Sequence, residues 1–85
     1  MSKYEKLKER MMSIPSDFTY TELRTFLTHI GFVEINKGRT SGSRVLFYRQ
    51  ADSRGFLLHK PHPGDIMKKG ALKQVVIQLK EWGEI

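Results

Sequence analysis

The sequence has no cysteine, few prolines and no long apolar run. The absence of cysteine excludes a disulfide framework and a thiolate metal site. Histidines and carboxylates are scattered along the chain, so we expect neither a metal ion nor another cofactor. The charged opening segment, MSKYEKLKER, argues against a signal peptide, and no stretch is apolar enough to span a membrane. We therefore expect a cytoplasmic protein with no membrane partner.

The length of 85 residues predicts a single domain, residues 1–85. A chain of this size buries roughly 60–65% of its unfolded surface, so its core is modest. Such a core leaves little room for a deep, enclosed active site. Any chemistry is therefore expected on an open face or in a groove.

Basic residues outnumber acidic ones by fifteen to nine, and the excess is concentrated in one part of the chain. The segment 37–73 holds nine basic and two acidic residues, a net charge of +7, while the remainder nearly cancels. A concentrated excess of this kind is typical of proteins that bind polyanions such as RNA. The alternative is a solvated basic face that serves solubility.

The periodicity of apolar residues predicts an α+β fold in the order helix, helix, three-stranded antiparallel meander, helix. The first amphipathic helix, within residues 3–14, ends near Ser13, ahead of Pro15, and the second opens with a capping box from Thr19 to Glu22 and ends at Gly31. The remaining expected elements are strands at 32–35, 44–49 and 56–60 and a helix at 70–82. Turns are expected at 37–42 and 52–55, and an irregular Pro-His-Pro-Gly loop follows the last strand.

One face of such a meander is covered by helices and the other is left to solvent. Along the second strand Arg44, Leu46 and Tyr48 share one face, opposite Val45, Phe47 and Arg49. The sequence does not decide which of these two sets faces the helices.

Lysines gather where the last helix begins, at Lys68, Lys69 and Lys73. A helix start offers unpaired backbone amides and the positive end of the helix dipole, and added lysine charge suits a phosphate ligand. Lysine in a first turn otherwise disfavours the helix, so this cluster calls for an explanation. The alternative is an incidental basic turn.

Three histidines are candidates for proton transfer, because imidazole titrates near neutral pH. His29 falls inside the second helix and is expected to be a structural or surface residue. His59 lies in the third strand and His62 in the Pro-His-Pro-Gly loop, where a plain turn role is the alternative. RNA cleavage needs such a group, and an arginine such as Arg44 suits the phosphate and its developing charge.

Three segments carry a resemblance to the HicA family: Thr40-Ser41-Gly42-Ser43-Arg44-Val45-Leu46-Phe47-Tyr48, Leu58-His59-Lys60-Pro61-His62-Pro63-Gly64 and Met67-Lys68-Lys69-Gly70-Ala71-Leu72-Lys73. The resemblance covers residues 19–82, with residues 1–15 as an N-terminal helical extension. It implies a fold like that of double-stranded-RNA-binding domains, in the order helix, three strands, helix. It also implies a toxin of a toxin–antitoxin pair that cleaves or blocks mRNA and that a HicB-like antitoxin neutralises by covering the active face.

From the basic cluster and this resemblance together we predict a set of RNA- and phosphate-binding residues. They are Lys37, Arg39, Ser43, Arg44, Lys60, Lys68, Lys69 and Lys73.

The chain departs from the family at one position that matters. The family's catalytic histidine follows Gly-Ser in the second strand, and here that position is Arg44, which stays protonated and cannot act as a general base. One hypothesis is a metal-independent endoribonuclease in which His59 or His62 transfers the proton and Arg44 holds the phosphate. The alternatives are an RNA-binding protein that has lost cleavage and a module that binds only other proteins.

Overall fold

The computed structural model describes residues 2–36, 44–61 and 64–85. It confirms the predicted α+β class, and the order of its last five elements is the one that the resemblance implies. The elements are α1 (Lys3–Met12), α2 (Tyr20–His29), β1 (Val33–Asn36), β2 (Arg44–Arg49), β3 (Arg54–His59) and α3 (Lys69–Glu81). The predicted bounds of 44–49 match β2, and the other predicted bounds differ from the observed ones by at most two residues. The turn predicted at 37–42 and part of the Pro-His-Pro-Gly loop lie outside the described residues.

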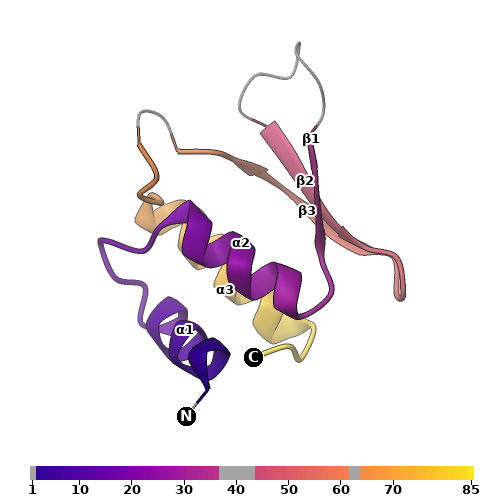
Figure 1. Ribbon diagram of the computed structural model, residues 1–85, viewed down its shortest axis with the longest axis horizontal. Coiled ribbons are helices and arrows are strands. Elements are labelled where there is room, and N and C mark those ends of the chain that lie inside the picture. The colour runs from indigo at the N-terminus through magenta and orange to yellow at the C-terminus, as the bar shows by residue number, and fades with distance from the viewer. Residues whose placement is uncertain (1, 37–43, 62–63) are drawn as a thin grey trace.

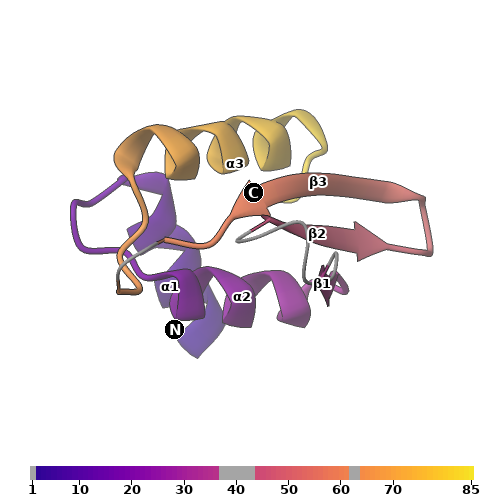
Figure 2. The ribbon, with the colours of Figure 1, turned by 90° about the horizontal axis from the view of Figure 1, so that it is seen from above.

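The helices lie on one side of the sheet, in two layers. Figure 1 shows α2 and α3 across one face of the sheet, with α1 on the far side of these two helices. Figure 2, seen from above, shows α2 and α3 running side by side. No helix of the described residues lies over the opposite face of the sheet. No helix of the described residues is long and apolar enough to cross a membrane.

The sheet is antiparallel with the strand order β1-β2-β3. Val45 and Phe47 are 1% and 0% exposed and face α2 and α3, which settles the orientation that the sequence left open. Arg44, Leu46 and Tyr48 therefore face away from the helices. Phe47 is paired with Glu34 on β1 and with Phe56 on β3.

Aromatic side chains fill the space between the sheet and the helices. Phe18, Phe32 and Phe47 are fully buried, and Phe56 and Trp82 pack against the ring of Phe32 at centroid distances of 5.5 and 5.9 Å. The side chains that α3 adds to this core are Leu72, Val75, Val76 and Leu79. Burial of such large apolar surfaces is the main stabilising contribution in a domain of this size.

Arg49 and Arg54 attach the β2–β3 hairpin to the end of the chain. Arg49 donates to Ile30 O at 2.8 Å, to Asp52 Oδ2 at 2.7 Å and to the Glu84 carboxylate. Its guanidinium also lies 4.8 Å from the centroid of the Phe32 ring. The Arg49 guanidinium holds the pKa of Asp52 below its usual range.

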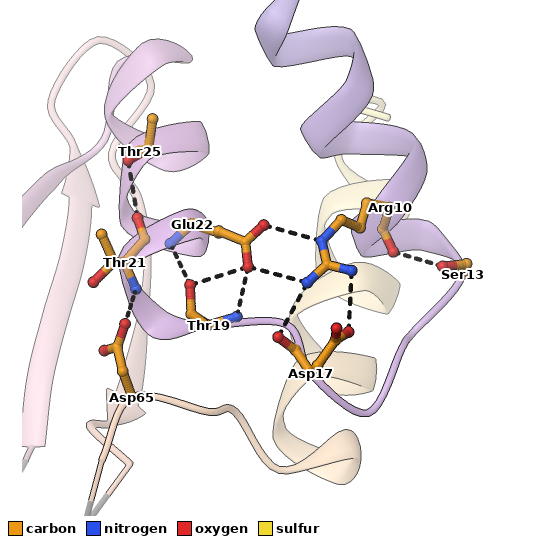
Figure 3. Close-up of polar contacts among 8 residues, drawn as sticks. All are labelled: Arg10, Ser13, Asp17, Thr19, Thr21, Glu22, Thr25 and Asp65. Atoms are coloured by element: carbon orange, nitrogen blue, oxygen red, sulfur yellow. Dashed lines mark hydrogen bonds and ion pairs between the residues drawn. The ribbon is translucent and has the colours of Figure 1, made fainter.

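α1 is joined to α2 by a polar junction at Arg10 (Figure 3). The Arg10 guanidinium donates to both Glu22 carboxylate oxygens, at 3.0 and 3.2 Å, and to Asp17 Oδ1 at 3.0 Å. Glu22 also accepts from the Thr19 backbone amide at 3.0 Å, which completes the predicted capping box. One carboxylate therefore both caps α2 and fastens α1 to it.

The buried side chain of Met11 supplies the apolar part of this attachment, and its truncation tests it. Met11→Ala leaves a cavity beneath α1, so we expect a loss of about 2–4 kcal/mol in the free energy of unfolding, measured with urea. Met12→Ala is the matched control, because Met12 is the next residue of the same helix and is 38% exposed. Equal losses for the two variants would contradict the described packing of α1.

The Glu22 junction predicts a pH dependence. Arg10, and then the Thr19 bonds, lower the pKa of Glu22 in the folded state below its ordinary value of about 4.3. The carboxylate thus stabilises the fold above about pH 4.3, and this contribution is lost as the pH falls through the lower folded pKa. Glu22→Gln keeps the cap but removes the titration. The difference in unfolding free energy between the wild type and this variant should shrink on acidification, and a difference that is constant with pH would contradict the linkage.

Candidate RNA interface

Arg44 and His59 are direct partners in the register of β2 and β3. Arg44 is the first residue of β2, His59 is the last residue of β3, and both are exposed. Opposed residues of antiparallel strands project from the same face, with Cβ atoms about 4.5–5.5 Å apart. The side chains of Arg44 and His59 therefore leave the sheet next to each other, at one end of the open face.

The rest of that open face is apolar. Leu46 and Leu57 are paired next to Arg44 and His59, and β1 adds Val33 and Ile35. Val33 is 61% exposed and Leu57 is 52% exposed. The Arg44–His59 pair thus borders an exposed apolar surface formed by the described residues of the sheet.

Lys60, a predicted phosphate ligand, is engaged within the protein. Its ammonium lies 5.7 Å from the centroid of the buried Tyr20 ring, on the helix side of the sheet. The Tyr20 hydroxyl donates to Glu34, and Glu34 also lies 3.8 Å from the Arg24 guanidinium. Burial, and then this bond to Glu34, raise the pKa of Tyr20. These contacts hold the end of β3 in place next to His59.

The segment that leads into α3 is fastened to the start of α2. The Asp65 carbonyl accepts from the Tyr20 amide at 2.6 Å, and the Asp65 carboxylate accepts from the Thr21 amide at 3.1 Å (Figure 3). The Met67 amide donates to Phe18 O at 2.8 Å. Sequence reasoning missed Asp65, because these partners lie more than forty residues away along the chain. The only signal was that Asp65 is one of two acidic residues in the basic segment.

The start of α3 has the character of an anion site. Lys68 is the N-cap residue, and no side chain among the described residues caps this helix, whereas Ser2 and Thr19 cap α1 and α2. The first turn contains no acidic residue, and Lys69 and Lys73 are exposed. Three features favour a phosphate here: the uncapped backbone amides, the positive end of the helix dipole and the charge of the lysines.

Figures 1 and 2 both show the start of β2 and the end of β3 at the end of the sheet that is nearer to the start of α3, whereas the β2–β3 hairpin lies at the far end. The structure thus pairs Arg44 with His59 at the end of the sheet that is nearer to the lysine-rich start of α3. His29 is separate from this group, because its ring stacks on Tyr4 of α1 at a centroid distance of 3.5 Å. The predicted site residues Lys37, Arg39, Ser43 and His62 lie outside the described residues.

The fold and this surface describe a small α+β protein with a cationic end and an open sheet face. The family model described as HicA toxin of bacterial toxin–antitoxin matches residues 20–83, most of the chain. The chain belongs to the HicA toxin family and is a toxin of a toxin–antitoxin system. No curated protein and no solved structure gives a significant match. α1 lies outside the matched residues.

Proposed function

We propose that this toxin is a metal-independent endoribonuclease that acts on mRNA, whether single-stranded or structured. The observation that carries the proposal is the direct pairing of Arg44 with His59 on the open face. Cleavage of RNA requires removal of the proton from a 2′-hydroxyl and protonation of the leaving oxygen, which an imidazole can perform. A permanently charged arginine next to it suits the phosphate and the charge that develops on it.

The register explains how this chain could dispense with the family's histidine. Arg44 occupies that position on β2, and neighbouring strands lie about 4.8 Å apart. A histidine at the paired position of β3 therefore keeps an imidazole on the same face and at the same end of the sheet. If the histidine stands on β3 and not at the paired position of β2, the imidazole is carried by another strand but stays in nearly the same place on the sheet.

The cationic start of α3 supports an extended RNA contact. Lys68, Lys69 and Lys73 can hold phosphates at the start of α3, which is nearer to the sheet end that carries the Arg44–His59 pair than to the β2–β3 hairpin. Such contacts position the backbone without reading the sequence. We therefore propose that the lysines of α3 hold the RNA while Arg44 and His59 act on one phosphate.

The proposed protein partner is a HicB-like antitoxin. An apolar face of this kind, with a polar group at its border, is typical of surfaces that bind other proteins. Leu46, Leu57, Val33 and Ile35 make the face next to Arg44 and His59 such a surface. A partner that covers it would also cover the proposed catalytic pair.

Cleavage of an mRNA pool in EDTA tests the catalytic pair. We expect the wild type to cleave, and His59→Ala and Arg44→Ala each to lose about a hundredfold or more in rate, because each removes a group used in the reaction. His29→Ala is the control, since its imidazole lies elsewhere.

Three other results are informative. Loss of cleavage in His62→Ala with His59→Ala unaffected would assign the imidazole to His62. Cleavage that depends on a divalent ion would contradict the metal-independent mechanism. Intact RNA binding without cleavage by folded wild type would contradict the nuclease and leave the RNA-binding alternative.

RNA affinity as a function of salt tests the α3 site. Charge reversal by Lys68→Glu with Lys69→Glu should weaken binding roughly tenfold or more. It should also reduce the slope of log affinity against log salt by about two, because fewer counterions are released on binding when two phosphate contacts are lost. The double variant Lys3→Glu with Lys6→Glu on α1 changes the net charge equally. Equal weakening by both double variants would indicate only a general charge effect and would remove the start of α3 from the interface.

A further inference from the structure

A groove runs between β3 and α3, on the helix side of the sheet edge. Its volume is about 160 Å³. The residues that line it are Phe56, Leu57, Leu58, Gln74, Val75 and Gln78. Gln74 and Gln78 are one turn apart on α3, so their amide groups lie on the same face of the helix.

β3 forms one edge of the sheet, because its only strand partner among the described residues is β2. About half of the N–H and C=O groups of an edge strand point away from the sheet. Edge strands are usually protected by proline, lysine, inward-pointing charge or shortness. The interior of β3 is Gly-Phe-Leu-Leu, without any of these features, whereas β1 at the other edge has four residues and includes Glu34.

We propose that β3 binds an extended segment of a partner protein as a fourth antiparallel strand. Successive side chains of an added strand point to opposite sides. Those on one side would enter the groove against Val75 and the two glutamines. Those on the other side would extend the apolar surface from Leu57, which is 52% exposed. Both faces of such a strand therefore find apolar contacts.

The charges around the groove specify the chemistry of this segment. The start of α3 carries Lys68, Lys69 and Lys73, and Arg44 lies opposite the end of β3. Along β3 and α3 the only acidic residue is Glu81, the last of α3. The segment is therefore apolar in its middle and acidic at the end that lies beside His59. In an antiparallel addition this is its N-terminal end.

A second copy of this chain does not meet these requirements. Antiparallel pairing of β3 with itself would set Arg54 of one copy against the His59–Lys60 end of the other. The net charge of +6 also opposes association of two copies. The inference does not depend on RNA binding or on cleavage, since neither is used in the argument.

The probe for this strand site is a synthetic peptide of alternating valine and threonine with glutamates at its N-terminus. We expect it to bind and to protect alternate amides of β3 from hydrogen exchange, followed by NMR. Leu57→Lys should weaken binding roughly tenfold or more through lost apolar burial and added edge charge. Val33→Lys is the matched control on the other edge strand and should leave the affinity unchanged.

Two further peptides separate an added strand from other modes of docking. A peptide N-methylated at alternate amides cannot pair along the edge and should not bind. A peptide with lysines in place of the glutamates should bind more weakly than the acidic one.

Four results would overturn the proposal. The first is no binding of the acidic peptide, and the second is binding that survives N-methylation. The third is equal weakening by Leu57→Lys and Val33→Lys, which would place the peptide on the open face. The fourth is protection of β3 amides by self-association without peptide, which would make a second copy the occupant.

Discussion

The burial of Phe47 against α2 and α3 determines where every candidate functional residue lies. Side chains alternate along a strand, so an inward Phe47 requires Arg44 to point outward three residues earlier. The register then carries this orientation to β3, where His59 must share the face of Arg44. A register slip of one residue would move both groups to the helix side. The packing of one aromatic ring thus fixes the site that lies on the opposite face.

The helices of the described residues lie over one face of the sheet only, which leaves the other face and the β3 edge open. The chain adds α1 outside the residues that match the family, but places it over α2 and α3. Arg10 and Met11 hold α1 there, on the far side from the sheet. The addition therefore enlarges the core without covering Arg44, His59 or the edge of β3.

Much of this fold follows from local sequence signals. Apolar spacing predicts the helices, the capping box predicts the start of α2, and Gly31 takes the positive φ of 101° expected after a helix end. The orientation of the sheet could not be predicted, because Leu46 and Tyr48 make the outer face of β2 nearly as apolar as the inner one. Alternation then gives no contrast between the two faces. Only the three-dimensional packing of Phe47 decides between them.

The candidate site, like the fold, could be predicted from the sequence only in part. Lysines at the start of α3 are visible in the sequence, since they are consecutive and precede a periodic helix. The roles of Asp65 and Lys60 are not visible in the sequence. Asp65 contacts Thr21 and Lys60 contacts Tyr20, and each partner is about forty residues away along the chain. Nor does the sequence show that His59 faces Arg44, because a strand pairing depends on the length and conformation of the connection between the strands.

The proposal that His59 replaces the histidine expected at position 44 is best understood through the whole sheet and not through one strand. A residue that replaces a histidine can keep the chemistry only if an imidazole reaches the same region of the same face. In an antiparallel pair, the directly opposed position meets this condition most closely, whereas diagonal neighbours are about 7–8 Å apart. His59 occupies the opposed position, and the contact of Lys60 with Tyr20 holds the next residue of the chain. In the proposed reaction, the fixed end of β3 therefore positions the imidazole next to the place on β2 where the resemblance to the HicA family implies it.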